Sequence, residues 1–270
     1  MSGEQTGGTG TVEFLVRPDG TVVGDDGASG ALAAALPYAG RLARRMGELV
    51  EAGDLRTVQA LGVRLLTVGV TWTAAGEGTF RAVLVPLEPR TVPAFMVVGG
   101  ADTSAAVAHC VSRVLTLEGV VWSSIVTADS RVIAAAGERL DVRFAEVGTR
   151  MLAILRTFEG QHATGFVRLT YEGAAMVGAS LGRHALVVLA SSADDDELVA
   201  VIDEVRAILA DHDLSAVTTE PDPDAASTDV AEVGSAPEPA PAAAPPLVGA
   251  RFGRAPTAGR APGRRRFGSG

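Results

Sequence analysis

The side chains that could do acid–base, nucleophilic or metal chemistry are few and scattered in this 270-residue chain. Its four histidines lie far apart and lack the spacing of metal ligands: His109, His162, His184 and His212. The single cysteine, Cys110, follows His109 in a predicted helix, where adjacent side chains point about 100° apart, so the two are not placed as nucleophile and base. The sequence therefore predicts no catalytic site and no metal site.

The residues from which phosphate and metal loops are built are also missing. No lysine occurs in the sequence, so a Walker-type loop, which needs a lysine beside its glycines, cannot form. The acidic run Asp194–Glu197 is not followed by alternating ligands, and such a run is typical of the first turn of a helix. We therefore expect no cofactor and interpret the protein as a non-enzyme.

Composition limits the class of protein. The formal net charge is −9 and all 23 basic residues are arginine, which argues against a general nucleic-acid-binding protein because phosphate binding relies on clustered basic residues. A single cysteine excludes an intrachain disulfide and is typical of a reducing compartment. The first residues lack the pattern of a signal peptide, and no apolar run of about 18 residues could span a membrane. We expect a cytoplasmic protein without a transmembrane segment.

Residues 119–213 have a regular succession of predicted elements. The run Val120–Val126 and the segment Arg131–Ala135 predict a hairpin. Apolar residues recur every three or four positions between Asp141 and Phe158, which predicts an amphipathic helix. Three strands and a last helix follow, at 163–171, 174–181, 185–191 and 194–209. Six residues of the amphipathic helix are candidates for a core or an interface: Phe144, Val147, Met151, Ile154, Leu155 and Phe158.

The N-terminal part has the same order of elements. Strands at Thr11–Val16 and Thr21–Val23 predict a hairpin, and the helical spacing of apolar residues over Leu32–Val50 predicts a long helix. Pro37 lies near the first turns of that helix, where proline bends or restarts a helix. Three strands follow, at 58–66, 68–73 and 80–87. An order that occurs twice indicates an α+β fold built from two similar units.

One family has this order of elements. With Asp102–Glu118 as a leading helix, residues 101–213 read as helix, hairpin, helix, three-stranded meander and helix. This order, with Leu117–Val121 before the first strand, resembles the roadblock/dynein light chain family of small α/β modules. The resemblance implies a five-stranded antiparallel sheet with helices and supplies no catalytic motif. One departure is Asp129-Ser130 in the first hairpin, where family members often carry Asp-Gly.

The predicted organisation is a tandem of roadblock-like modules. The segment Gly62–Thr67 echoes Gly165–Thr170, which supports a duplication in which the first copy has lost its leading helix. The helix Asp102–Leu117 could close the first module, open the second, or do both, and a short strand is possible at Phe95–Val98. The expected divisions are a disordered segment 1–10, a divergent module 11–100, a second module 101–214 and a disordered Ala/Pro-rich and Arg-rich tail 215–270.

The resemblance also implies a mode of association and a partner. In roadblock-like modules the middle helix packs against its counterpart in a second module, so Asp141–Phe158 would pair with Leu32–Val50 in an internal pseudo-dimer, or with another chain in a homodimer. Bacterial relatives commonly bind or regulate small Ras-like GTPases, which suggests a regulator or scaffold of such a GTPase. Two alternatives stay open: a ligand-sensing domain of the PAS or GAF kind, and an assembly or secretion chaperone.

The end of the chain carries a cluster of positive charge. Between Gly249 and Gly270 the sequence holds arginines and no acidic residue, namely Arg251, Arg254, Arg260, Arg264, Arg265 and Arg266. Such a segment can form an electrostatic contact with an acidic protein, a nucleic acid or an anionic lipid surface. It can equally serve as an intramolecular partner for the acidic body or as a solubilising tail.

Overall fold

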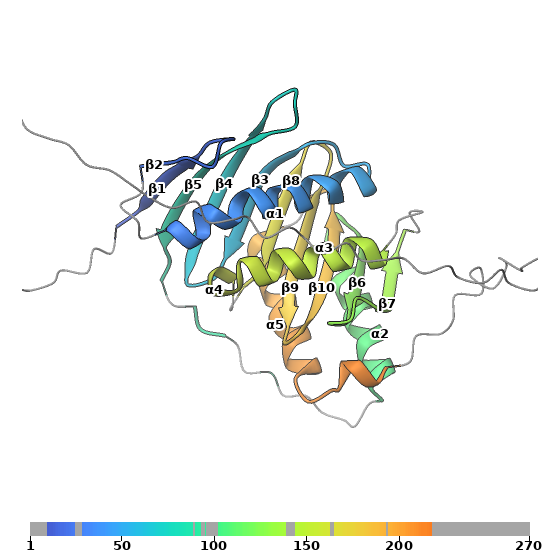
Figure 1. The fold of residues 1–270 in the computed structure, drawn as a ribbon. Coiled ribbons are helices and arrows are strands. Elements are labelled where there is room, and N and C mark those ends of the chain that lie inside the picture. The colour runs from blue at the N-terminus through green and yellow to red at the C-terminus, as the bar shows by residue number, and fades with distance from the viewer. Residues whose placement is uncertain are drawn as a thin grey trace, which may run out of the picture. The chain divides into compact units, whose positions relative to one another are not determined.

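The computed structural model describes residues 10–24, 29–88, 90–92, 95, 102–138, 144–162, 165–192 and 194–217 (Figure 1). The chain divides into two units, Met1–Glu220 and Pro221–Gly270, and every described residue belongs to the first. The disorder predicted for 1–10 and 215–270 therefore falls almost wholly outside the described residues. Within them, Leu214–Ala216 forms a short 3-10 helix, η1.

In the described part of the chain, strands form one ten-stranded sheet in the order β2-β1-β5-β4-β3-β8-β9-β10-β6-β7. Neighbouring strands are antiparallel throughout. The strands are β1 Val12–Val16, β2 Val22–Val23, β3 Leu55–Leu61, β4 Arg64–Trp72, β5 Gly78–Pro86, β6 Val120–Val126, β7 Val132–Gly137, β8 Val167–Tyr171, β9 Ala175–Leu181 and β10 His184–Ala190. The fold class is therefore α+β with a large antiparallel sheet, as the sequence predicts.

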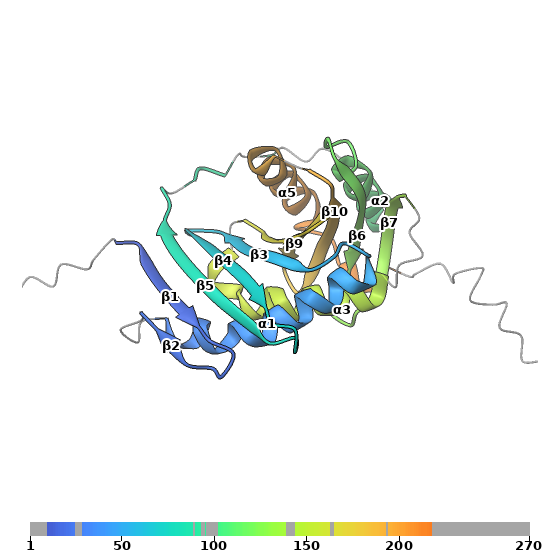
Figure 2. The same ribbon diagram turned by 90° about the horizontal axis from the view of Figure 1, so that it is seen from above.

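Helices cover the two faces of the sheet unequally. The helices are α1 Gly30–Leu49, α2 Thr103–Val114, α3 Phe144–Thr157, α4 Glu159–His162 and α5 Asp195–Leu209. One face carries α1 and α3, and the other carries α2 and α5 (Figure 2). The pair α2 and α5 contacts β6, β7 and β9, which lie at the end of the sheet farthest from β2. We call the part made of β1–β5 and α1 the first half, and the part made of β6–β10 and α2–α5 the second half.

The strand order of the two halves is mirrored about the centre of the sheet. Each half places a hairpin at the outside and a three-stranded meander at the inside, with one long helix between them in the chain. The meanders meet where β3 pairs with β8, and Val58 lies opposite Leu169. This arrangement brings the two long helices onto one face of a continuous sheet.

Two hydrophobic cores follow from this layout. The first lies between the sheet and the helices α1 and α3, and it contains buried residues of both halves, among them Phe14, Met46 and Ile154. The second lies beneath α2 and α5 and is built from buried residues of the second half, with Leu61 packed at its margin. The first core therefore joins the halves, whereas the second stabilises one of them.

Several predicted boundaries were wrong. The first two strands of the first meander are β3 and β4, separated by a turn at Gly62-Val63, whereas the prediction ran a strand through this glycine and broke it at Thr67. The echo of Gly62–Thr67 with Gly165–Thr170 therefore aligns β4 with β8, which are not equivalent in the mirrored order. The described Phe95 is not in a strand, and the rest of the strand predicted there lies outside the described residues.

Two open questions about helices are decided by the structure. The helix α2 packs on β6, β7 and α5, so it belongs to the second half and opens it. The helix α1 continues through Pro37 without an interruption. Proline removes one hydrogen bond to the preceding turn, and burial of Ala33, Leu36, Ala39 and Ala43 on either side holds the helix against the sheet.

Candidate functional site

The helices α1 and α3 lie side by side and run in opposite directions on one face of the sheet (Figure 1). Each has a glycine that lies against a side chain of a strand. A Cβ on Gly40 would lie 2.5 Å from Cε1 of Phe80, and a Cβ on Gly148 would lie 2.6 Å from Cγ2 of Val126. Contacts this short do not occur between real atoms, so any larger residue would push the helix away from the sheet.

Five of the six candidate residues lie in α3, the sixth, Phe158, follows it directly, and all six face the sheet. Val147, Met151, Ile154, Leu155 and Phe158 are buried in the core that the two halves share. Phe144 is partly buried, and its ring meets the ring of Trp122 edge-on, with centroids 5.0 Å apart. The outer surface of the helix pair is therefore formed by other residues.

A hydrogen bond links the two halves beneath the helix pair. The Tyr171 hydroxyl in β8 donates to the carbonyl oxygen of Ala43 in α1 at 2.7 Å. A Cβ on Gly47 would lie 2.6 Å from the Tyr171 ring, so the helix passes directly over this side chain. Burial raises the pKa of Tyr171 far above its usual range, so the hydroxyl keeps its proton and acts as a donor.

The outer surface of the helix pair carries an aromatic ring among arginines. Tyr38 is 50 % exposed, and Arg41 is exposed without a hydrogen bond or ion pair to the described residues. Arg45 donates to Glu48 at 2.7 Å, which raises its pKa, with a smaller contribution from Glu146 of α3.

The residue of α3 that lies beside Tyr38 can be derived from the position of Arg45 near Glu146. The helices are antiparallel and rise about 1.5 Å per residue. Tyr38, seven residues before Arg45, therefore lies beside Ala153, seven residues after Glu146. We call Tyr38, Arg41, Arg45 and Thr149 the helix-pair surface.

One arginine of α1 is less solvated than its sequence pattern indicates. The spacing of Arg44 and Glu48 is usual for a solvated helix face, but Glu48 pairs with Arg45 instead. Arg44 lies over the Trp72 ring, 4.9 Å from its centroid, and its Nε is 3.6 Å from a carboxylate oxygen of Asp54. Helical spacing does not reveal this environment, because Trp72 and Asp54 reach this position from distant parts of the chain.

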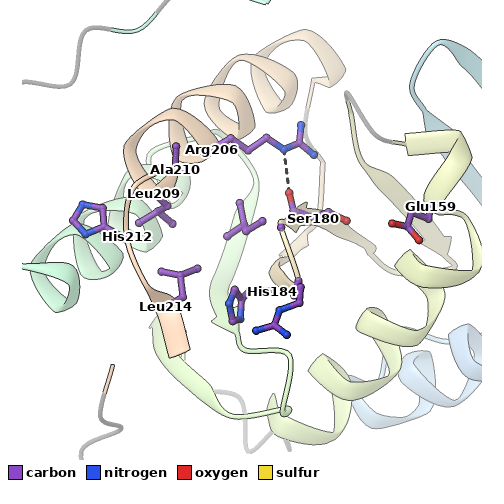
Figure 3. A pocket seen from close by; sticks show the side chains of 11 residues that line it. Glu159, Ser180, His184, Arg206, Leu209, Ala210, His212 and Leu214 are labelled. Atoms are coloured by element: carbon purple, nitrogen blue, oxygen red, sulfur yellow. Dashed lines mark hydrogen bonds between the residues drawn. The ribbon is translucent and has the colours of Figure 1, made fainter. Parts of the chain in front are cut away.

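A recess of about 560 Å³ lies at the tip of the β9–β10 hairpin (Figure 3). Ser180, the turn residues Gly182 and Arg183, and His184 form one wall, and Leu209, His212 and Leu214 of the α5 end and η1 form another. Glu159 of α4 faces the recess from the opposite side. A smaller hollow of about 290 Å³ adjoins it and is lined by the same hairpin tip together with Leu152, Leu155 and Arg156.

Two polar residues at the recess are fixed by the backbone around them. Arg206 donates from Nε to the Ser180 carbonyl oxygen at 3.1 Å and from Nη2 to the Gly165 carbonyl oxygen at 2.6 Å. The Ala128 amide donates to Nδ1 of His184 at 3.1 Å. Burial and the nearby Arg183 lower the pKa of His184, so the ring stays neutral with its remaining proton on Nε2.

The described residues contain no set of three or more histidine, cysteine, aspartate or glutamate side chains that could hold a metal ion. Cys110 is buried, and burial raises its pKa to about 11, so its thiol is not a nucleophile at neutral pH. Asp194 caps α5 by accepting from the amides of Asp196 and Glu197 at 2.9 and 3.1 Å, which explains the acidic run. The six tail arginines from Arg251 to Arg266 lie outside the described residues.

Comparison with known proteins finds only structural likeness of low similarity. No family model matches the chain, and no curated protein matches it. Among solved structures, a roadblock/LC7 domain from Streptomyces avermitilis is similar at 16 % identity and a TM-score of 0.33, covering 41 % of this chain and 96 % of that one. Similarity at this level does not establish the family. Among the described residues, no helix has both the length and the apolar character needed to cross a membrane.

Proposed function

We propose that this chain is a non-enzymatic protein-interaction module of the roadblock type, which regulates or scaffolds a small Ras-like GTPase. The order of elements in the sequence supports the family, and the described residues contain no metal cluster. The observation that carries the proposal is the helix-pair surface, where the half-exposed Tyr38 lies one helical turn before Arg41, an exposed arginine without a hydrogen bond or ion pair to the described residues. Tyrosine and arginine are enriched among the residues that contribute most to protein–protein affinity.

The proposal includes an internal pseudo-dimer. Residues 11–100 and 101–214 are two copies of one module, and the second copy supplies to the first what a second chain supplies in a homodimer. The pairing of β3 with β8 and the packing of α1 against α3 support this organisation. When the two helices are aligned at Gly40 and Gly148, Tyr38 and Arg41 of α1 correspond to Glu146 and Thr149 of α3, so a partner would meet two unlike helices.

The alternative of a ligand sensor requires a cavity between the sheet and its helices. The space beneath α1 and α3 is instead filled by buried side chains, including Met46, Met151 and Phe158. The recess at the hairpin tip lies at the surface, beside the ends of α4 and α5. The tail arginines are proposed to add an electrostatic contact with an acidic partner.

Binding to GTPases of defined nucleotide state tests the proposal. The purified chain is mixed with each small GTPase of the host, loaded with GDP or with a non-hydrolysable GTP analogue. We expect one GTPase to bind, with an affinity that depends on the nucleotide. Regulators of small GTPases contact the switch loops, and the γ-phosphate orders these loops. Binding that ignores the nucleotide would favour a scaffold without regulation, and no binding to any of them would contradict the proposal.

A pair of variants locates the contact. The double change Tyr38→Ala and Arg41→Gln should weaken GTPase binding about tenfold or more, since it removes two exposed side chains of the types that dominate interfaces. Arg81→Gln is the matched control: Arg81 is exposed in β5 and points away from α1, because its neighbours Phe80 and Ala82 face the shared core. Equal weakening by both variants would mean that the helix-pair surface is not the contact with the GTPase.

A further inference from the structure

The side of the first half that faces away from α1 is left open by the helices of the described chain. Figure 2 shows no helix over β1, β5 and β4 on this side, whereas α2 and α5 pack on β6, β7 and β9 in the second half. Opposite residues of antiparallel strands share one face of a sheet, so Glu13, Val83, Thr67 and Gln59 form a row across β1, β5, β4 and β3. Their chain neighbours, such as Phe14, are buried in the core beneath α1. We call the side that carries this row the outer face of the first half.

The outer face mixes apolar and hydroxyl side chains. Leu15, Leu65 and Val83 are partly buried, and Val85, opposite Leu65, is 37 % exposed. Thr67 lies among them, opposite Val83. The corresponding side of the second half is instead built of fully buried apolar residues beneath α2 and α5. A mixed surface is typical of partners that associate reversibly, because such interfaces are only about as apolar as the rest of a protein surface.

The charged side chains of β1 and β5 neutralise each other on this face. Arg81 donates from Nε at 2.8 Å and from Nη2 at 2.5 Å to one carboxylate oxygen of Glu13. At the margin Arg168, opposite Gln59, forms an ion pair with Asp195 at 2.6 Å. The whole chain has a formal net charge of −9, so two copies repel each other unless they meet where acidic side chains are already paired. The outer face offers such a place, and a second copy is therefore the partner that its charges fit.

We propose that the outer face of the first half binds the same face of a second copy of this chain, with the two sheets packed face to face in a two-fold dimer. One self-complementary face is enough for such a dimer, and packed sheets lie about 10 Å apart with their side chains interdigitated. A hollow of about 450 Å³ at the edge of the face, lined in part by Leu15, Val23 and Gly24, leaves room for side chains of the second copy. The helix-pair surface lies on the other side of the sheet (Figure 2), so the dimer does not depend on the proposed GTPase and leaves that surface free.

The size of the face indicates how firmly the copies hold together. Four strands about 4.8 Å apart and roughly seven residues long cover about 450 Å² in projection. Two copies therefore contribute about 900 Å², which lies at the low end of specific protein interfaces. We expect a reversible dimer whose population rises with the protein concentration.

Sedimentation velocity of the full chain tests the association, from low to high micromolar concentration. We expect the weight-average sedimentation coefficient to rise from that of a monomer towards that of a dimer, because a small interface dissociates on dilution. A monomer at every concentration would overturn the proposal. Growth beyond the dimer would overturn it as well, since a two-fold contact between like faces closes after two copies.

Two matched valine variants locate the contact. Val85→Glu should weaken dimerisation about tenfold or more, because it brings like charges of the two copies together in an apolar contact. Val22→Glu is the control: Val22 is 39 % exposed, close to the 37 % of Val85, but it lies opposite Val16, which faces the core beneath α1. Circular dichroism shows that both variants fold. A dimer that Val85→Glu leaves unchanged, or that both variants weaken equally, would overturn the proposal.

Cross-linking keeps the test decisive if Val85→Glu does not fold. Cys110 is buried and its pKa is raised to about 11, so it does not compete with a thiol introduced at the surface. Thr67→Cys places that thiol in the middle of the row across the outer face, where a short bismaleimide can span two facing sheets. We expect it to give a covalent dimer faster than Val22→Cys does. Equal rates for the two variants would mean random collisions and would overturn the proposal.

Discussion

At the scale of single residues, His184 links the hairpin tip to the β6–β7 turn. Its Nδ1 accepts from the Ala128 amide, so protonation of the ring would remove the acceptor. Burial, then the charge of Arg183, holds its pKa below the usual value of about 6.5. Because the folded-state pKa is depressed, the stabilising contribution is fully present above about pH 6.5 and is lost as the pH falls through the folded value.

The change His184→Gln tests this linkage. The glutamine does not titrate, so the difference in unfolding free energy between the wild type and the variant should shrink or change sign as the pH falls from about 7.5 to about 5. Urea denaturation at several pH values measures that difference. His109→Gln changes an exposed histidine on α2 and serves as the control. A constant difference for His184→Gln would mean that the hydrogen bond to Ala128 does not govern its titration.

Single residues also show where sequence reasoning stops. The buried candidates of α3 follow from helical periodicity, since Val147, Met151 and Ile154 recur every three or four positions and face the sheet. The recess cannot be predicted from periodicity, because Glu159, Arg183 and Leu209 come together only after three distant elements have packed. The sequence signals were modest: an arginine in a two-residue hairpin turn, and a carboxylate just after the end of an amphipathic helix.

At the scale of elements, Gly148 determines how closely α3 approaches the sheet. A methyl group there would overlap both Cγ atoms of Val126, at 2.6 and 2.8 Å. Gly148→Ala should therefore destabilise the protein by about 1 to 3 kcal/mol, although alanine favours a helix interior by about 1 kcal/mol over glycine. Chemical denaturation measures the change in the free energy of unfolding.

Two further variants make the Gly148 prediction specific. Gly160→Ala lies in α4, where an added Cβ meets no atom within 4 Å, so it should be neutral or slightly stabilising. Val126→Ala removes the overlapping methyl groups, and the double variant should be more stable than the sum of the two single changes predicts. Additive effects of Gly148→Ala and Val126→Ala would show that the helix does not rest on this strand.

The type and order of the helices and strands were predicted better than the residues at which they begin and end. Both hairpins, both long helices and both meanders follow from periodicity and turn residues. The boundary between β3 and β4 was misplaced because the residues from Val58 to Leu66 are nearly all apolar, which hides a turn at Gly62-Val63. Such a run of residues does not reveal where a strand reverses, and pairing with β8 fixes the extent of β3.

At the scale of the whole molecule, the shared core determines how the halves unfold. The order hairpin, helix, meander predicts two similar units, but the sequence alone leaves open whether their long helices meet within one chain. In the structure α1 packs against α3, β3 pairs with β8, and the first core contains residues of both halves. Neither half can keep its long helix covered without the other, so we expect one cooperative transition rather than two.

The two tryptophans report on this cooperativity, because Trp72 lies in the first half and Trp122 in the second. In the Trp72→Phe variant, fluorescence follows the second half alone, and in Trp122→Phe it follows the first. Within each variant, the midpoint of the fluorescence change in guanidinium chloride should coincide with the midpoint of the far-ultraviolet circular dichroism change, which follows the whole sheet.

Each substitution lowers stability by itself, through the lost bond from Trp72 to the Leu55 carbonyl oxygen or through a cavity in place of the buried Trp122. The comparison is therefore made within a variant. If fluorescence changed at a lower denaturant concentration than dichroism in either variant, the halves would be independent domains, and the internal pseudo-dimer would have to be abandoned.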